Sequence, residues 1–186
     1  MTVVITLPFG RPLTRADLEG LGESPDDGHR YELIDGVLIV SPSPQFRHQV
    51  MVGNLYLLLR NACPEGMQVL LAPFAVVLAE DTEVQPDLIV APRSQFTRKM
   101  LPGPPLLAVE VLSPSTRRVD LLLKRDRLQS AGVPSYWLVD PDGPSVTVLE
   151  LRDGSYVEVA QVSGDEACEV DAPFRMRIVA AGLLED

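Results

Sequence analysis

The chain has 186 residues, 46% of them hydrophobic, and a formal net charge of −10. Its length suits one domain, and its apolar content excludes an intrinsically disordered chain. The negative charge argues against a protein that coats nucleic acid nonspecifically, because the phosphate backbone attracts cationic surfaces. No segment approaches the roughly 20 apolar residues of a membrane-spanning helix, so no membrane partner is expected.

Cysteine and histidine are scarce in the chain. Cys63 and Cys168 are far apart, and together with only two histidines they form no zinc-type spacing. Two unclustered cysteines suit a reducing interior, and the N-terminal segment lacks the basic start of a signal peptide. We therefore expect a cytoplasmic protein without a zinc site.

The first predicted elements are a short helix, a hairpin and a longer helix. Residues 13–20 carry helix start and stop signals. Residues 31–40 predict a hairpin, since Asp35-Gly36 separates two β-prone runs and favours a type I′ turn. Residues 45–62 predict an amphipathic helix. Its expected apolar face comprises Val50, Val52, Leu55, Leu57, Leu58 and Leu59.

The remaining elements are strands and one more helix. The polar, Pro/Gly-rich segment 92–104 predicts a loop. Hydroxyl caps at residues 113–116 open a helix that ends near Ala131, and a second hairpin is expected around Asp153-Gly154. Apolar runs predict further strands at residues 67–71, 74–79, 87–91, 105–112 and 135–140.

This order predicts an α/β fold of the mixed α+β type, in which helices flank a central mixed β-sheet. We expect a single domain over residues 1–186, with a core at about 28–142 and an acidic, β-rich extension at about 143–186. Eleven acidic and three basic residues between positions 140 and 186 make this last part acidic.

Glu110 lies inside an apolar run, LLAVEVLS. Both faces of the predicted strand are apolar, which is typical of a central, buried strand. An ionised carboxylate there costs several kcal/mol unless it is paired. Glu110 is therefore either a structural ion-pair partner of a residue such as an arginine, or a metal ligand, and we favour the ligand.

Asp87 lies at the start of an earlier predicted strand, PDLIVA. Proline suits the start of a strand, although Pro-Asp also occurs in ordinary turns. An irregular hairpin through the 92–104 loop would bring Asp87 and Glu110 side by side. Adjacent carboxylates repel, and both ionise comfortably only around a cation. Oxygen ligands favour magnesium or manganese.

Lys124 is one of only two lysines in the chain, against fourteen arginines. It follows Asp120 by four residues on the predicted helix, so the two could form an ordinary surface pair. Alternatively, Lys124 points towards the sheet, where it would hold or deprotonate an attacking water or meet developing phosphate charge.

Glu32 has apolar strand neighbours, as Glu110 does, and is either a solvent-facing carboxylate or a further ligand of the metal or its water. His48 on the second predicted helix could face the same site. Trp137 is expected to be a core residue rather than a platform for stacking bases.

The succession of these segments resembles the Uma-two family of predicted bacterial restriction endonucleases, in the PD-(D/E)xK nuclease superfamily. The resemblance covers roughly residues 12–150, and it depends on the order and spacing of the motifs together. The motifs are YELIDG, SPSP with Arg47-His48-Gln49, QPDLIV, VEVLSPST, Asp120 with Lys124, and AGVPSYWLVDP.

The resemblance implies a restriction-endonuclease-like, nuclease-type core and cleavage of phosphodiesters that depends on Mg²⁺ or Mn²⁺. It makes Asp87 and Glu110 the metal ligands, with the carbonyl of Val111 as a third. In the superfamily pattern a lysine stands two residues after the glutamate, and Leu112 occupies that place here. The resemblance implies that Lys124 substitutes for it from the helix, oriented by Asp120.

The leading hypothesis is a metal-dependent endonuclease with catalytic residues Asp87, Glu110 and Lys124, and with Glu32 and Asp120 in support. DNA is the expected partner. A homodimer or higher homo-oligomer is expected, because double-strand cutting needs two sites and the helices carry spare apolar surface. The alternatives are a catalytically silent nuclease-fold module that binds or assembles, and a hydrolase of another phosphate ester.

Overall fold

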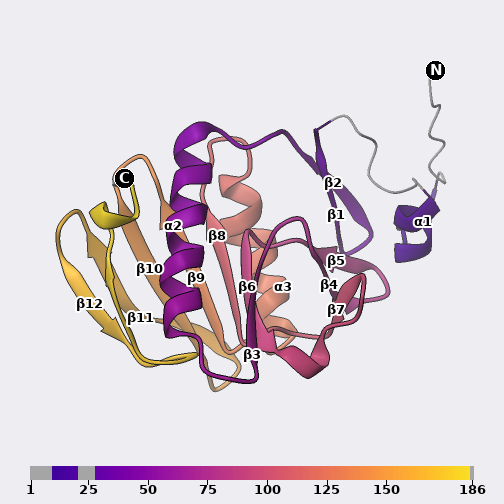
Figure 1. Ribbon diagram of the computed structural model, residues 1–186. Coiled ribbons are helices and arrows are strands. Elements are labelled where there is room, and N and C mark those ends of the chain that lie inside the picture. Colours follow the sequence, from indigo (N-terminus) through magenta and orange to yellow (C-terminus); the bar gives the residue numbers. More distant parts are fainter. Residues whose placement is uncertain (1–9, 21–27, 185–186) are drawn as a thin grey trace.

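A computed structural model describes residues 10–20 and 28–184 of the chain (Figure 1). The N-terminal segment that lacks the features of a signal peptide lies mostly outside these residues. No helix of the described part is both long and apolar enough to cross a membrane.

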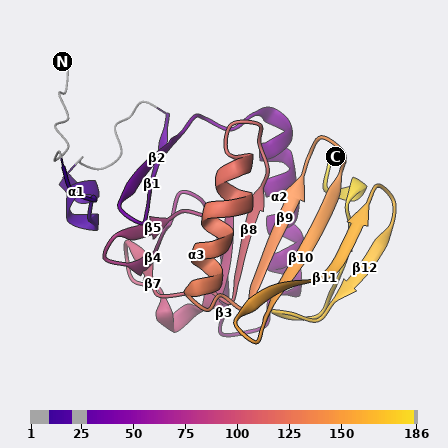
Figure 2. The ribbon, with the colours of Figure 1, turned by 180° about the vertical axis from the view of Figure 1, so that it is seen from behind.

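The centre of the molecule is a six-stranded mixed sheet with the strand order β11-β10-β9-β8-β6-β3 (Figures 1 and 2). Only the pair β8 and β9 is parallel within this sheet; the other neighbours are antiparallel. The sheet crosses position 142 without a break, because β10 pairs with β9 along its length. The strands are β3 (Met67–Leu71), β6 (Leu88–Pro92), β8 (Leu107–Val111), β9 (Ser135–Asp140), β10 (Ser145–Arg152) and β11 (Ser155–Ser163).

A second sheet of five strands has the order β2-β1-β5-β4-β7. Its first two strands form the predicted hairpin, in which Asp35 and Gly36 both adopt positive φ, as a type I′ turn requires. The predicted loop over residues 92–104 holds a strand, β7, that pairs in parallel with β4. The strands are β1 (Arg30–Ile34), β2 (Val37–Ser41), β4 (Ala75–Ala79), β5 (Thr82–Val84) and β7 (Met100–Pro102).

Helix α2 (Phe46–Ala62) lies across one face of the six-stranded sheet (Figure 1). A two-stranded sheet, β12 (Ala167–Val170) and β13 (Met176–Val179), and the short helix η3 (Ala181–Leu183) pack on the same core. The buried face of α2 differs from the predicted one, since Leu57 is 58% exposed. The residues it buries are His48, Met51, Val52, Leu55 and Leu59.

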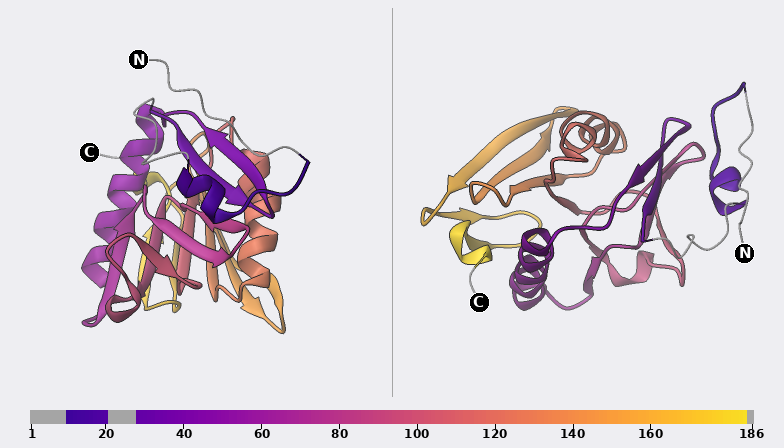
Figure 3. Two further views of the ribbon diagram at one scale, coloured as in Figure 1. Left: turned by 90° about the vertical axis from the view of Figure 1, so that its right-hand side faces the viewer. Right: turned by 90° about the horizontal axis from the view of Figure 1, so that it is seen from above.

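The opposite face is covered by the five-stranded sheet and by one helical segment (Figures 2 and 3). The predicted helix is present, but it begins as a π-helix, η2 (Val119–Lys124), and continues as α3 (Arg125–Ser130). A π turn widens the helix and is frequent at functional sites. Here it carries two buried charged residues, Asp120 and Lys124.

Two short helices complete the described residues. Helix α1 (Arg15–Gly20) is the predicted N-terminal helix, and it is joined to the five-stranded sheet by a hydrogen bond from Arg15 N to Glu80 O. The 3₁₀ turn η1 (Arg93–Gln95) follows β6 directly, inside the segment predicted as a loop.

Candidate active site

The sheet register places Asp87 opposite Glu110. Leu88 pairs with Val109 and Ile89 with Ala108, so Asp87, one residue before β6, faces Glu110 on the neighbouring strand β8. Opposed residues of antiparallel strands project from the same face of a sheet. Both residues are buried, and the negative charge of Asp87 raises the pKa of Glu110. The proximity expected from the sequence is therefore present.

Three donors surround the Asp87 carboxylate. Arg30 Nη1 donates to Oδ1 at 2.8 Å, and the backbone N–H of Val111 donates to Oδ2 at 2.9 Å. His48 Nε2 lies 3.2 Å from Oδ2. Burial alone would raise the pKa of Asp87, but the His48 contact and the charge of Arg30 hold it below its ordinary value. Asp87 is therefore fixed as an anion.

Glu110 has the opposite environment. It is completely buried, and Lys124 Nζ donates to its Oε1 at 2.8 Å, whereas Oε2 has no hydrogen-bond partner among the described residues. Burial raises the pKa of Glu110 well above its ordinary value, against the attraction of Lys124. Asp120 and Asp87 raise it further because they are like charges.

Lys124 lies at the centre of a cluster of carboxylates. Its Nζ is 2.9 Å from Glu32 Oε1 and 3.5 Å from Asp120 Oδ1, in addition to the contact with Glu110. Burial alone would lower the pKa of Lys124, but these three carboxylates raise it above its ordinary value. Lys124 is therefore a protonated ammonium at neutral pH.

Glu32 and Arg30 link the surroundings of Asp87 to the cluster around Lys124. Glu32 Oε1 accepts a hydrogen bond from Gln85 N at 2.6 Å, and its Oε2 lies 3.7 Å from Arg30 Nε. Arg30 Nη1 also donates to the carbonyl of Gln85 at 3.1 Å. One guanidinium therefore holds both Glu32 and Asp87.

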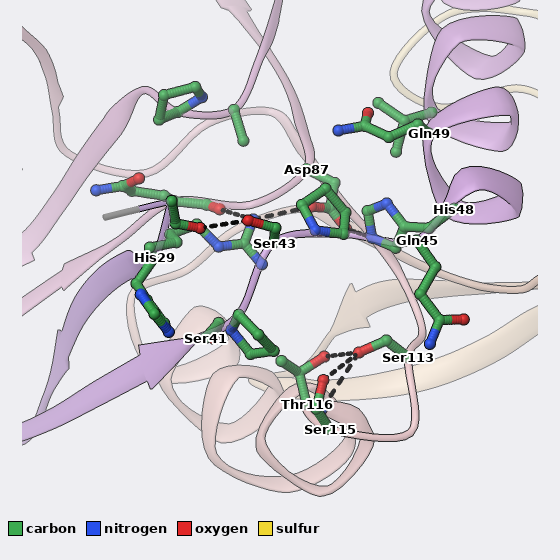
Figure 4. A pocket seen from close by; sticks show the side chains of 18 of the residues that line it. His29, Ser41, Ser43, Gln45, His48, Gln49, Asp87, Ser113, Ser115 and Thr116 are labelled. Carbon is green, nitrogen blue, oxygen red and sulfur yellow. Dashed lines mark hydrogen bonds and ion pairs between the residues drawn. The ribbon is translucent and has the colours of Figure 1, made fainter. Parts of the chain in front are cut away.

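A cleft of about 650 Å³ opens over Asp87 (Figure 4). Asp87 and His48 lie together at one side, and the hydroxyls of Ser113, Ser115 and Thr116 gather at the other. Arg30 also lines this cleft, but the residues of the Lys124 cluster do not. The candidate site thus has an open part around Asp87 and a buried part behind it.

The residues around Asp87 and Glu110 fit a divalent cation. The four carboxylates Glu32, Asp87, Glu110 and Asp120 share two cationic side chains, Arg30 and Lys124, which leaves two negative charges uncompensated if all four ionise. Buried Oε2 of Glu110 and Oδ1 of Asp120 also lack hydrogen-bond partners among the described residues.

The described residues contain no group of three or more His, Cys, Asp or Glu side chains placed to hold a metal. A metal held by Asp87 and Glu110 alone would therefore need oxygens of water or substrate to complete its coordination.

The sequence did not single out Arg30. Its partner Asp87 is 57 positions away, and Arg30 begins a strand directly after a polar segment. The available signal was the two-residue period of β1, which places Arg30 on the same face as Glu32. Of the other two residues considered, His48 does line the cleft, and Trp137 is fully buried in the core.

The chain was compared with known protein families. Residues 18–181 match the model of the Uma2 family, described as "Putative restriction endonuclease". The chain belongs to this family. The predicted family is therefore confirmed, over a longer range than the motifs covered.

The fold is similar to a crystal structure described as a "putative nuclease belonging to DUF820" from Anabaena variabilis ATCC 29413. The TM-score is 0.74 at 20% sequence identity, over 93% of this chain and 98% of that one. The similarity confirms the predicted restriction-endonuclease-like mixed α+β fold. A search of curated proteins found no match.

Proposed function

We propose that this chain is a metal-dependent endonuclease that hydrolyses phosphodiester bonds of DNA. The observation that carries the proposal is the pairing of Asp87, which lines the cleft, with Glu110 behind it, whose buried Oε2 has no hydrogen-bond partner among the described residues. Membership of the family described as "Putative restriction endonuclease" supports the same reaction class.

Asp87 and Glu110 would hold Mg²⁺ or Mn²⁺, with the carbonyl of Val111 as a further ligand. When bound, such an ion supplies Lewis-acid polarisation of the phosphate and a water activated at neutral pH. The Val111 N–H keeps the Asp87 carboxylate in place through its bond to Oδ2. Asp87 thus presents its remaining oxygen, Oδ1, in a fixed orientation.

In this proposal Lys124 acts as a cation rather than as a proton acceptor. Its raised pKa and its three carboxylate partners keep it charged. It orients Glu110, while Asp120 and Glu32 hold the ammonium. Because the Lys124 side chain lies behind the cleft, we assign it as a positioning residue.

Cations at the cleft rim would offset the net charge of −10 near a DNA backbone. Arg47 adjoins the cleft residues of α2, and Arg117 and Arg118 follow Thr116; all three are exposed. Arg117 also pairs with Asp140 at 2.6 Å. These three cations could contact only a few phosphates, so DNA binding should depend only modestly on salt.

The test is cleavage of single-stranded and double-stranded DNA with Mg²⁺ or Mn²⁺, by the wild type and by Asp87→Asn. Asp171→Asn is the matched control, because Asp171 is exposed and remote in sequence from the site. We expect Asp87→Asn to reduce the activity by roughly 100-fold or more, because replacing even a residue that only supports a metal ligand typically costs about 10- to 100-fold. Equal cleavage by both variants would contradict the proposal.

A second candidate is a catalytically silent module that binds or assembles. Two observations favour it: Leu112 stands where the superfamily has its lysine, and Lys124 does not line the cleft. The exposed Leu122 and Leu123 would supply apolar surface for a homodimer. Metal binding without cleavage of any DNA would support this candidate.

A further inference from the structure

Arg30 was not among the residues predicted for the site from the sequence. Its side chain is 19% exposed and lines the cleft, yet its guanidinium bonds to Asp87 Oδ1 and to the Gln85 carbonyl. Its Nε also faces Glu32 at 3.7 Å. Among the described residues, Arg30 is the cationic side chain that contacts both Asp87 at the cleft and Glu32 in the buried part of the site.

The two oxygens of Asp87 are not equivalent. Oδ2 has two partners, the Val111 N–H and His48 Nε2, and a carboxylate oxygen has about two lone-pair directions. Oδ1 has one partner, Arg30. A metal at Asp87 would therefore bind Oδ1, next to the Arg30 guanidinium, whose positive charge opposes that of the metal.

The guanidinium has a second place to go. The cleft that it lines is the space in which a phosphate of the substrate would lie next to Asp87. Arginine is suited to that contact, because its planar fork can donate two hydrogen bonds to one phosphate. Arg30 contacts the Gln85 carbonyl and Glu32 through its side chain, so a change of side-chain rotamer could break both contacts with the β1 backbone in place.

We propose that Arg30 is an exchangeable cation, which holds the metal's place at Asp87 in the metal-free protein and contacts the scissile phosphate once the metal binds. This inference rests on the proposed function. It makes Arg30 a catalytic residue that competes with the metal for Oδ1.

The proposal predicts that a variant without the Arg30 charge binds Mn²⁺ more tightly but cleaves DNA more slowly. Arg30→Met keeps the length of the side chain and removes the charge. We expect Mn²⁺ to bind this variant at least about tenfold more tightly in calorimetric titration, the change that corresponds to one charged hydrogen bond. DNA cleavage at saturating Mn²⁺ should fall at least about tenfold, because the phosphate loses its arginine.

Arg15→Met is the matched control. Arg15 is 22% exposed and pairs with Glu83 at 2.8 Å, an ion pair of the same length and similar exposure that lies outside the site. Neither its Mn²⁺ affinity nor its cleavage rate should change. If Arg30→Met does not fold, Arg30→Gln takes its place, with the same two signs expected, since glutamine removes the charge but keeps a polar side chain.

The outcomes separate the two proposals. If the wild type binds Mn²⁺ and Asp87→Asn does not, but the folded Arg30 variant binds Mn²⁺ no more tightly than the wild type, Arg30 has only a structural role. An Arg30 variant that binds Mn²⁺ more tightly but cleaves DNA at the wild-type rate would also overturn the proposal, because Arg30 would then make no contact with the phosphate that matters for cleavage. If the wild type binds no Mn²⁺, or Asp87→Asn binds it equally, the proposed function itself fails.

Discussion

Asp87, one residue before β6, and Glu110 on β8 face each other and are both buried, yet their carboxylates have different hydrogen-bond partners. Asp87 lies at the open cleft with three donors around its carboxylate, and its pKa is lowered. Glu110 lies behind it with one donor and with an oxygen, Oε2, that has no partner in the described part of the chain, and its pKa is raised. One carboxylate is stabilised as an anion by the protein, whereas the other lacks sufficient positive charge.

This difference indicates how the site could use a metal. The Asp87 part is preorganised, because its donors fix the anion before any ligand arrives. The Glu110 part is destabilised by burial of negative charge, and an added divalent cation would relieve it. The following experiments test this contrast, from the largest expected effect to the smallest.

Lys124→Met should produce the largest effect. It would leave Glu32, Glu110 and Asp120 buried without their common cation. Removing one partner of a buried ion pair costs about 3–5 kcal/mol of unfolding free energy. Urea denaturation at pH 7 measures this loss.

Lys99→Met is the natural control, because Lys99 is the only other lysine and is exposed. Its stability should stay within about 0.5 kcal/mol of the wild type. Equal stability of both lysine variants would show that the carboxylate cluster does not depend on Lys124.

Mn²⁺ should stabilise the wild type but not Glu110→Gln. A ligand that binds only the folded state adds about 2.7 kcal/mol at a free concentration of 100 times its Kd. Glutamine keeps an oxygen for Lys124 but loses the anionic charge, so the added stability should disappear. Thermal unfolding with and without Mn²⁺ measures this, and Glu158→Gln on the exposed face of β11 is the control. Metal stabilisation that survives in Glu110→Gln would count against Glu110 as a ligand.

Stability of the metal-free protein should depend on pH in opposite ways at the two carboxylates. The pKa of Glu110 is raised, so its favourable contribution exists below the unfolded value near 4.5 and is lost as the pH rises above it. The pKa of Asp87 is lowered, so its contribution exists above the unfolded value near 3.8 and is lost as the pH falls.

Relative to the wild type, Glu110→Gln should therefore gain stability as the pH rises above about 4.5, by about 1.4 kcal/mol for each pKa unit of the shift. The lower stability of Asp87→Asn relative to the wild type should become smaller as the pH falls below about 3.8. Denaturation midpoints across this range measure both slopes. If the stability difference from the wild type changed with pH in the same direction for both variants, the two carboxylates would not have opposite environments.

His48→Phe should have the smallest effect. The contact of His48 Nε2 with Asp87 is long, 3.2 Å, and the Val111 N–H would remain on the same oxygen. We expect a loss of about 1 kcal/mol, the net value of one hydrogen bond, and an acid transition shifted to higher pH. Acid denaturation followed by circular dichroism measures both, and an unchanged transition would show that His48 does not stabilise the Asp87 anion.

Sequence reasoning worked where the signal was local. Asp35-Gly36 and Asp153-Gly154 each specify a tight turn by the backbone conformation they favour, and both hairpins are present. Asp87 and Glu110 stood out because charges in apolar runs require a partner. The short strand β5 and the parallel strand β7 were missed because their pairing partners, not their own residues, make them strands.

The site was less predictable than the fold. Helical periodicity placed Leu57 in the core, but α2 turns that residue to solvent because His48, Met51 and Leu55 define the buried face. Arg30 and the π turn at Asp120 and Lys124 follow from contacts distant in sequence, which no local pattern records. The division of the chain at about residue 142 and the role of the Val111 carbonyl stay predictions.

The most direct measurement of the central claim is a crystal structure of the protein grown with Mn²⁺, with the ion located by its anomalous scattering. We predict one ion that contacts Asp87 Oδ1 and Glu110 Oε2, with the Arg30 guanidinium displaced from Asp87. Mn²⁺ bound only elsewhere, with Arg30 still on Asp87 and Glu110 Oε2 unpartnered, would contradict the account.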